Sequence, residues 1–342
     1  MGLVTPSSSI APFPRRTARA VRALAGLGFR PLFGPHATWQ PERKPSPAAL
    51  AADIAWCCEH PDVDVILCTT GGKTSVEILD DVDYNLLAAS RKVLCGFSDI
   101  TALLLAVYAR TGLVTCHGPT LLPSFGDADG VDPYTSMSLL DTLSPGVPAA
   151  GRVLAPPARS STDAPWWDRD DDRPRERSAA TGWWALAPGV ARGRLVGGHV
   201  RTMASLLGTP YLPDTDGALV FLETNAPHVD EVAADLGRLE AGGVFDRAAG
   251  LVFGRPLVVD RPDALYRAFA RLALDRRLPA LADVDLGHTV PLLSLPIGVT
   301  ATIDAEAGLL RVDEPAVAAR EPAQRSTVMT TMSLGTPPSR SL

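Results

Sequence analysis

The most informative segment for the fold is Lys92-Val-Leu-Cys-Gly-Phe-Ser-Asp-Ile-Thr101, together with the apolar residues that follow it. Lys92–Gly96 is a short apolar run, typical of a strand that is buried on both faces. Ile100–Thr111 is strongly apolar and long enough for a helix, and Leu113–Cys116 starts a further strand. A strand, a tight turn and a helix in this order predict one unit of a parallel sheet covered by helices.

The same alternation continues toward the N-terminus. Apolar residues at helical spacing predict a helix at Arg15–Leu27, and Ser46 is a suitable N-cap for a second helix at Pro47–His60. Residues 1–150 are therefore expected to form an α/β domain with a parallel sheet. Its remaining strands are predicted at Gly2–Thr5, Phe29–Phe33 and Asp64–Thr69.

A second α/β domain is predicted over residues 192–314, and two domains agree with a chain of 342 residues. The tail, residues 315–342, is rich in Ser, Thr, Pro and Arg without periodicity and is expected to be disordered. The predicted elements of the second domain are a helix at Val229–Glu240 and strands at Ala218–Leu222, Ala249–Phe253, Leu292–Leu295, Thr300–Asp304 and Leu309–Val312.

Composition and charge argue against several kinds of partner. The net charge of −6, without a long basic stripe, disfavours nucleic acid and an anionic membrane surface. No apolar run approaches the roughly 20 residues of a membrane span, and the first residues lack the pattern of a signal peptide. The five cysteines are odd in number and show no CxxC spacing, so we expect reduced, mostly buried thiols in a cytoplasmic protein. HExxH and paired Cys/His spacings are also missing, so we expect neither a metal nor a cofactor.

Residues 151–191 differ in composition from both domains. They are dense in Pro, Gly and charged residues, and a solvated linker is one interpretation. However, four of the six tryptophans lie here, as Trp166-Trp167 and Trp183-Trp184, and disordered linkers are usually poor in aromatic residues. The other interpretation is an exposed surface that closes on a flat ligand.

Ser98 is the first candidate for chemistry, because it lies in the turn between the predicted strand and helix. This turn belongs at the carboxyl edge of the sheet, where open α/β folds bind ligands. The helix N-terminus there can stabilise an anion, which suits a nucleophilic serine. The pattern is not GxSxG, since Ile100 replaces the second glycine, and an ordinary helix N-cap is the alternative role.

A serine nucleophile needs a base, and His288 lies in a loop of a kind common in active sites, Asp285-Leu-Gly-His-Thr289. Glu223 ends a predicted strand and can orient the imidazole, although it can also cap the next turn. A plain surface or hydrogen-bonding role is the alternative for His288. Gly71-Gly72 follows a buried strand without P-loop spacing, so we interpret it as a turn that offers N–H groups to an oxyanion.

Several segments, taken in chain order, resemble the LD-carboxypeptidase family of serine peptidases. Each motif is short, but the ordered set covers residues 3–313 and is specific as a whole. The segments are Thr5-Pro-Ser-Ser-Ser9, Thr70-Gly-Gly72, Gly96-Phe-Ser-Asp-Ile-Thr-Ala-Leu103, Thr111-Gly-Leu-Val-Thr-Cys-His-Gly-Pro119, Gly197-Gly198, Leu222-Glu223, Gly250-Leu-Val-Phe-Gly254, Gly287-His-Thr289 and Leu295-Pro-Ile-Gly298.

The resemblance implies a site between two domains, an N-terminal parallel-sheet domain and a C-terminal mixed α/β domain. By this resemblance, Ser98 is the nucleophile, His288 the general base and acid, and Glu223 its orienting carboxylate. The backbone N–H groups of Gly72 and Asp99 would form the oxyanion hole. The family also implies a cytoplasmic homodimer without metal.

Two branches of the family imply different substrates. One removes terminal D-alanine from muropeptides, and the other, the microcin C immunity branch, cleaves an aminoacyl-nucleotide amide. The tryptophan-bearing insertion makes this chain look closer to the second, in which Trp166 or Trp167 would stack on the base. His199 replaces the usual family asparagine in the region expected to bind substrate. A non-catalytic protein that binds a nucleotide-like or peptide ligand is the competing hypothesis from another class.

Overall fold

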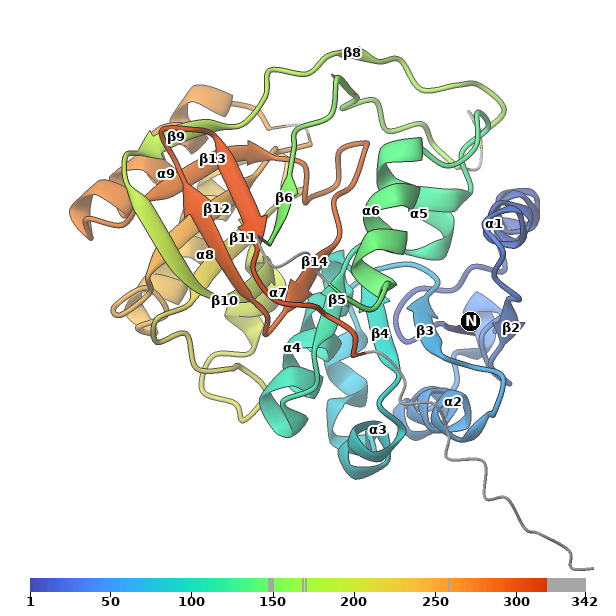
Figure 1. The fold of residues 1–342 in the computed structure, drawn as a ribbon. Helices are drawn as coiled ribbons and strands as arrows, with labels where there is room; N and C mark the ends of the chain where they lie inside the picture. Colours follow the sequence, from blue (N-terminus) through green and yellow to red (C-terminus); the bar gives the residue numbers. More distant parts are fainter. Residues whose placement is uncertain (147–150, 168, 170, 258, 319–342) are drawn as a thin grey trace, which may run out of the picture.

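The computed structural model describes residues 1–146, 151–167, 169, 171–257 and 259–318. The described chain forms two α/β parts, the N-terminal one on the right of Figure 1 and the C-terminal one on the left. This confirms the predicted α/β class and the two-part organisation. The predicted disorder of residues 315–342 concerns a tail of which all but the first four residues lie outside the described residues.

The N-terminal part is built on a six-stranded sheet. Its strands are β1 (Gly2–Val4), β2 (Leu32–Phe33), β3 (Val65–Cys68), β4 (Val93–Gly96), β5 (Thr115–His117) and β14 (Leu295–Ile297). They lie in the order β14-β5-β4-β3-β1-β2, and all neighbours pair in parallel except β14, which is antiparallel to β5. The predicted parallel sheet is therefore confirmed, with one antiparallel strand added from the far end of the chain.

Helices cover both faces of this sheet, because successive strand residues point to opposite sides. Leu67 and Cys95 belong to the apolar cluster under α1 and α5, whereas Ile66 and Leu94 belong to the larger cluster on the other face. The helical elements are α1 (Pro14–Gly26), η1 (Pro41–Arg43), α2 (Pro47–Glu59), η2 (Ser75–Asp81), α3 (Tyr84–Ser90), η3 (Ser98–Ile100), α4 (Thr101–Thr111), α5 (Leu121–Phe125) and α6 (Pro133–Leu143).

The C-terminal part contains an eight-stranded mixed sheet with strand order β6-β16-β15-β10-β11-β12-β13-β9. The four strands β10 to β13 run in parallel, and the other pairs are antiparallel. The strands are β6 (Arg152–Leu154), β9 (Trp184–Ala187), β10 (Val190–His199), β11 (Leu219–Glu223), β12 (Gly250–Gly254), β13 (Ala280–Val284), β15 (Thr300–Asp304) and β16 (Leu309–Val312). The helices are α7 (Val200–Ser205), α8 (Val229–Ala241) and α9 (Pro262–Asp275).

The end of β10 joins the two parts at the start of α4. Gly198 has φ +146°, and a Cβ there would lie 2.5 Å from the Thr101 side chain. Only glycine fits this close approach, and the next N–H, that of His199, donates to Thr101 Oγ1 at 3.0 Å. One apolar cluster extends through both parts, so the two sheets meet across a shared core.

Most predicted elements are found within a few residues of their expected bounds, and the strands at Thr300–Asp304 and Leu309–Val312 match exactly. Two predictions need correction. The strand expected at Phe29–Phe33 is only Leu32–Phe33, and the strand expected at Leu292–Leu295 is instead Leu295–Ile297. The sequence interpretation also missed α6, α9, β9, β13 and the long β10.

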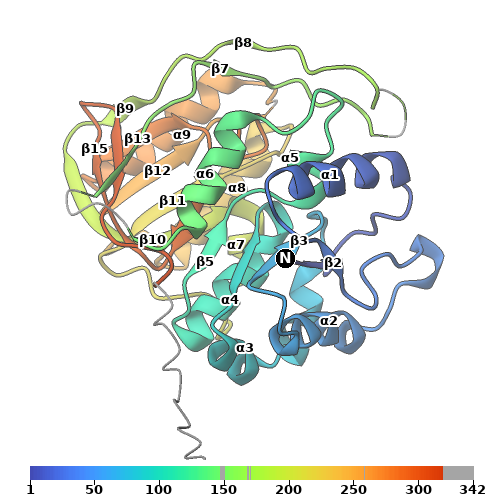
Figure 2. The same cartoon turned by 45° about the vertical axis from the view of Figure 1, so that its right-hand side comes forward.

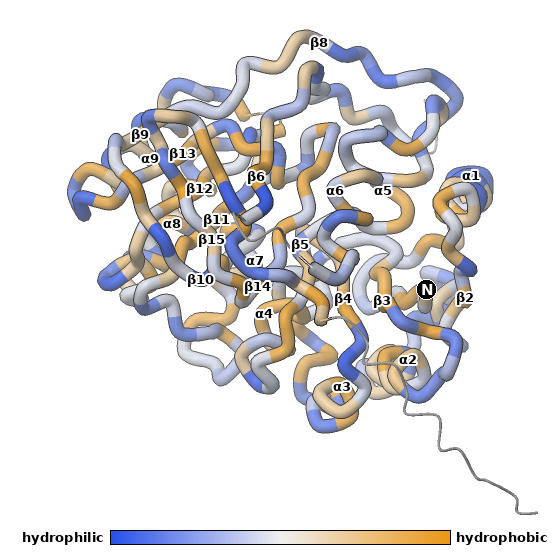
Figure 3. Tube along the Cα trace, in the orientation of Figure 1, coloured by the Kyte–Doolittle hydropathy of each residue, from blue (hydrophilic) through white to orange (hydrophobic). Residues whose placement is uncertain are grey.

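The bridging segment, which we define as residues 155–183, crosses from one part to the other above the sheets (Figures 1 and 2). It includes the short strands β7 (Arg159–Ser160) and β8 (Ser178–Ala179). Much of it is hydrophilic, in contrast to the apolar central strands (Figure 3). It is nevertheless ordered by ion pairs to the N-terminal part, including Arg175 Nε to Asp127 Oδ2 at 2.6 Å. These ion pairs argue against the interpretation of this segment as a solvated linker.

All five cysteines are free and buried, as expected from their apolar settings. Burial raises the pKa of Cys57 to about 12. Among the described residues, no helix has both the length and the apolar character that crossing a bilayer requires.

Candidate active site

Ser98 sits at a sharp turn between β4 and α4. Its φ is +63°, a left-handed conformation that costs a non-glycine residue on the order of 1–3 kcal/mol. The turn is tight because Gly96 has no side chain, and a Cβ there would lie 2.7 Å from Ile100 Cγ2. The strained turn places the Ser98 hydroxyl on the wall of a pocket, so this serine is not simply a helix cap.

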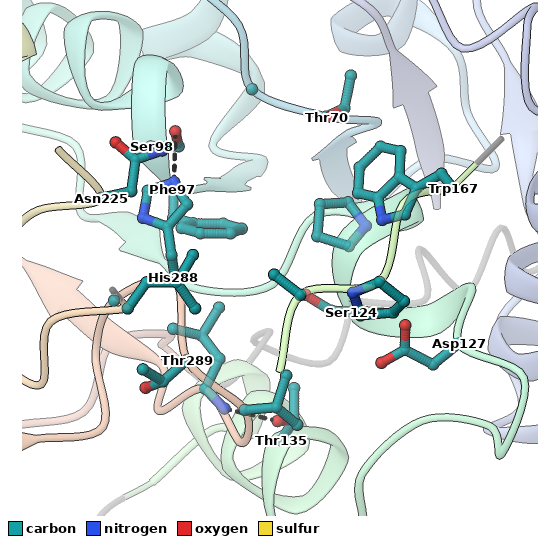
Figure 4. Close-up of a pocket in the computed structure, with 18 of the residues that line it drawn as sticks. Thr70, Phe97, Ser98, Ser124, Asp127, Thr135, Trp167, Asn225, His288 and Thr289 are labelled. Carbon is teal, nitrogen blue, oxygen red and sulfur yellow. Dashed lines mark hydrogen bonds between the residues drawn. The ribbon is translucent and has the colours of Figure 1, made fainter. Parts of the chain in front are cut away.

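Two residues from the C-terminal part complete a chain of hydrogen bonds with Ser98. His288 Nε2 lies 2.9 Å from Ser98 Oγ, and His288 Nδ1 lies 2.7 Å from Glu223 Oε2. Glu223 ends β11, and His288 follows β13 in a loop. Figure 4 shows Ser98 and His288 close together at one end of the pocket. The three predicted residues are therefore brought together in the order that a charge-stabilised base requires.

Glu223 is almost completely buried, and its surroundings favour the ionised form. Burial acts to raise its pKa, but the imidazoles of His288, His199 and His117 outweigh burial and lower it. His117 is itself fully buried, and burial lowers its pKa. It donates from Nε2 to the carbonyl of Leu286 at 2.6 Å, because a carbonyl oxygen can only accept.

The Gly71-Gly72 turn packs directly against the serine turn. A Cβ on Gly71 would lie 3.0 Å from Ser98 Oγ, and a Cβ on Gly72 would lie 2.2 Å from Ser7 Oγ. Asp99 holds this arrangement through its buried carboxylate, which accepts hydrogen bonds from Ser7 Oγ at 2.6 Å and from the Ser75 N–H at 2.9 Å. The backbone groups of two separate turns are thereby fixed beside the hydroxyl of Ser98.

The pocket that opens from Ser98 has a volume of about 410 Å³. This lies in the range of pockets that enclose small-molecule ligands. Trp167 forms the wall opposite Ser98, together with Phe13, and Figure 4 shows this indole across the cavity from His288. The Phe13 and Trp167 rings meet edge to face with centroids 5.3 Å apart. The pocket is therefore reactive at one end and aromatic at the other.

Buried charges support the aromatic end. The Arg16 guanidinium is almost fully buried and lies 4.7 Å from the Trp167 ring centroid. It pairs with Asp127 and, at 2.6 Å, with Asp171 of the bridging segment. Asp127 also accepts from Arg175, so α1, the residues after α5 and the bridging segment are tied together behind Trp167. The indole is thus held in place before any ligand arrives.

The other tryptophans have different surroundings. Trp166 is 64% exposed, with the Arg169 guanidinium 4.9 Å from its ring centroid, and it does not line the pocket. Trp184 is 39% exposed and contacts Tyr266, but Trp183 is buried. The expected exposed Trp183-Trp184 pair is therefore wrong for Trp183, whose indole lies in the core.

His199 contacts two residues of the pocket wall, Asn225 and His288. Its Nε2 is 3.1 Å from Asn225 Oδ1, and its ring centroid is 5.8 Å from that of His288. Asn225 lines the pocket, whereas His199 does not. The sequence interpretation missed Asn225, although its place just after the end of β11 was a usable signal. It also missed Phe13, for which the sequence carries no comparable signal.

Among the described residues, no group of three or more His, Cys, Asp and Glu side chains is arranged to hold a metal ion.

Comparison with known proteins finds relatives over most of the chain. The LD-carboxypeptidase N-terminal domain profile matches residues 1–118, and the LD-carboxypeptidase C-terminal domain profile matches residues 192–303. The Vibrio cholerae protein VC_A0337, which bears a provisional carboxypeptidase name, is 30% identical over 94% of this chain and 96% of its own length. The microcin C7 self-immunity protein MccF of Escherichia coli is 30% identical over 72% of each chain. A Bacillus subtilis protein provisionally named a murein peptide carboxypeptidase is 28% identical over 89% of this chain and 88% of its own.

Solved structures of MccF are similar over nearly the whole fold. The complexes with glutamyl sulfamoyl guanosine and with aspartyl sulfamoyl adenosine superpose with TM-scores of 0.85 and 0.86. Each is 26% identical and covers 93% of this chain and 96% of the other. The chain therefore belongs to the LD-carboxypeptidase family and is a serine-type hydrolase of that family.

Proposed function

We propose that this protein is a serine carboxypeptidase or amidase in which Ser98, His288 and Glu223 act as a catalytic triad. The observation that carries the proposal is the hydrogen-bonded chain from Glu223 through His288 to Ser98 at the end of a pocket of about 410 Å³. Glu223 would hold the imidazole with its proton on Nδ1, which leaves Nε2 free to accept the hydroxyl proton.

The reaction proceeds in two stages. Ser98 Oγ attacks the amide carbonyl while His288 Nε2 takes the hydroxyl proton. The imidazolium then protonates the leaving nitrogen, and the C–N bond breaks to give an acyl-enzyme ester. Water, deprotonated by His288, attacks the ester and releases the acid product and Ser98. The negative oxygen of each tetrahedral intermediate is stabilised by the N–H groups of Gly72 and Asp99.

The proposed substrate is an aminoacyl group joined by an amide-type bond to a nucleotide-like moiety, so that cleavage gives self-immunity or detoxification. Trp167 supports this assignment, because an indole fixed across the cavity from Ser98 offers a stacking surface for a base. The likeness to MccF structures that hold aminoacyl sulfamoyl nucleosides supports it as well. A cytoplasmic location and a homodimer are part of the same proposal.

The second candidate is a muropeptide LD-carboxypeptidase that releases terminal D-alanine. It is favoured by the similarity to the Bacillus subtilis protein provisionally named a murein peptide carboxypeptidase. The same triad would serve, because both substrates present an amide-type carbonyl to the serine. A ligand-binding protein without turnover is the alternative from another class.

A side-by-side assay separates these three possibilities. The purified protein is incubated with aspartyl sulfamoyl adenosine and with an L,D-tetrapeptide, and the products are measured by mass spectrometry. We expect kcat/KM for the nucleoside to exceed that for the peptide by at least tenfold. A preference for the peptide would support the muropeptide function. Tight binding with no product from either compound would contradict the proposed enzyme.

The two neighbouring tryptophans provide a matched pair of variants. Trp167→Ala is expected to raise KM for the aminoacyl nucleoside about tenfold, because base–aromatic stacking contributes about 1–3 kcal/mol. KM for the tetrapeptide should change little. Trp166→Ala should leave both values within about twofold, because that indole is 64% exposed and outside the pocket. Steady-state kinetics on both substrates measures the difference, and equal effects of Trp167→Ala on both substrates would contradict base stacking.

A further inference from the structure

The loop that carries His288 is attached to the bridging segment. The Ser161 N–H donates to the Val290 carbonyl at 2.6 Å, and the Val290 N–H donates back to the Ser161 carbonyl at 3.0 Å. This reciprocal pair forms an isolated antiparallel bridge two residues after His288. The position of the imidazole therefore depends on a segment that lies more than a hundred residues away in the sequence.

Asp285 is the second attachment, at the other end of the same loop. Its side chain is completely buried, and Oδ2 accepts a hydrogen bond from Trp183 Nε1 at 2.9 Å. Oδ1 lies 3.2 Å from the Arg255 guanidinium, which also bonds Ser160 of the bridging segment. Burial raises the pKa of Asp285 to about 6, so at neutral pH the carboxylate is ionised, accepts from the Trp183 indole and forms an ion pair with Arg255.

On its opposite side, the loop packs closely against Glu223 at Gly287. A Cβ on Gly287 would lie 3.2 Å from Glu223 Oε2 and 3.4 Å from the Arg255 carbonyl. The loop is therefore clamped between the carboxylate that orients His288 and the residues that hold Asp285. A small shift of this loop would move the imidazole relative to Ser98, and misplacement by about 1 Å can cost about 10²-fold in rate.

We infer that Asp285 is a positioning residue, which fixes the His288 loop to the bridging segment through Trp183 and Arg255. This inference rests on the proposed function of His288 as the catalytic base. Neither Asp285 nor Trp183 lines the pocket, so both act through His288 rather than on the substrate. The same bridging segment supplies Trp167, so one piece of chain organises the aromatic end of the pocket and the reactive end.

Two pairs of variants test the inference. Asp285→Asn keeps the side-chain shape but removes its charge, and Trp183→Phe removes the indole donor. Both are expected to lower kcat about tenfold while KM stays within twofold, because an interaction that acts only on the reacting geometry affects kcat. The matched controls are Asp235→Asn, a buried carboxylate of α8 bonded to Arg201, and Trp184→Phe, which is half exposed. Both controls should keep kcat within twofold.

Hydrogen–deuterium exchange of residues 285–291 supplies a readout that needs no substrate. Exchange in this peptide should be faster in Asp285→Asn and Trp183→Phe than in the wild type, and unchanged in the two controls. If the wild type turns over neither substrate, the proposed function fails, and this exchange pattern still decides whether Asp285 holds the loop. Unchanged kcat in folded Asp285→Asn, or unchanged exchange in both test variants, would overturn the inference.

Discussion

Replacement of Ser98 by alanine is expected to lower kcat on the order of 10⁴-fold or more, because the hydroxyl that would form the acyl-enzyme is removed. In the proposed triad the Ser98 hydroxyl donates to His288 Nε2, with the two atoms 2.9 Å apart, and a water molecule in its place could not form the covalent intermediate. Substrate binding should persist, since the pocket walls are unchanged. Stopped-flow and steady-state assays on aspartyl sulfamoyl adenosine measure the loss, and mass spectrometry of the intact protein detects the acyl adduct.

The left-handed backbone at Ser98 provides an unusual control for that experiment. Ser98→Gly should be as inactive as Ser98→Ala but more resistant to thermal unfolding, because glycine adopts a φ of +63° without strain. Ser90→Ala, at the end of α3, should retain wild-type activity. An acyl adduct on Ser98→Ala, or turnover near the wild-type level, would remove Ser98 from its proposed role.

Replacement of Glu223 by glutamine is expected to lower kcat by about 10³–10⁴-fold, with little change in KM. The carboxylate can only accept from His288 Nδ1, so it holds the imidazole proton there and leaves Nε2 free for Ser98. A glutamine amide can donate to Nδ1 instead, which places the proton on Nε2 and blocks its action as a base. The rate measurement pairs with Glu231→Gln as a control, since Glu231 is an ion-paired residue on the surface of α8. A loss of less than tenfold in Glu223→Gln would argue against an orienting carboxylate.

The same substitution also has a predicted dependence on pH. The pKa of Glu223 is lowered in the folded protein from its ordinary value of 4.5, so the folded state binds fewer protons than the unfolded state as pH falls through that region. The stability contributed by the ionised carboxylate is therefore fully present above about pH 4.5 and is lost as the pH falls further. The free energy of unfolding of Glu223→Gln should be lower than that of the wild type at pH 7, and the difference should shrink below pH 4.5. Denaturant titrations at several pH values measure this difference.

The local parts of the fold could be predicted because their signals are contiguous. A short apolar run followed by a longer one predicts a strand and then a helix, and the structure has β4 at Val93–Gly96 and α4 at Thr101–Thr111. The β10 strand was missed because Gly197 and Gly198 normally interrupt a strand. In the folded chain these glycines are required, because the strand passes within contact distance of the Phe221 backbone and the Thr101 side chain.

The site could be predicted in part for the same reason. Ser98 and Glu223 each follow an apolar strand, so the sequence marks them as residues at a sheet edge. Their partnership with His288 came from a resemblance in ordered motifs rather than from spacing. Nothing in the sequence distinguishes Trp166 from Trp167, because adjacent residues in an irregular segment have no periodicity to separate the buried side chain from the exposed one.

The strand–turn–helix unit around Ser98 could be predicted from the sequence alone. The α/β class and the family could be predicted too, because all three depend on side-chain periodicity and on short motifs within single segments. Which side chains meet depends on the tertiary structure. Ser98 and His288 are separated by 190 positions, and Glu223 and His288 by 65. Their hydrogen bonds form because β14 joins the N-terminal sheet, β10 packs on α4, and the bridging segment holds the His288 loop through Asp285. These contacts depend on packing between segments that are far apart in the sequence, and local sequence patterns do not predict such packing.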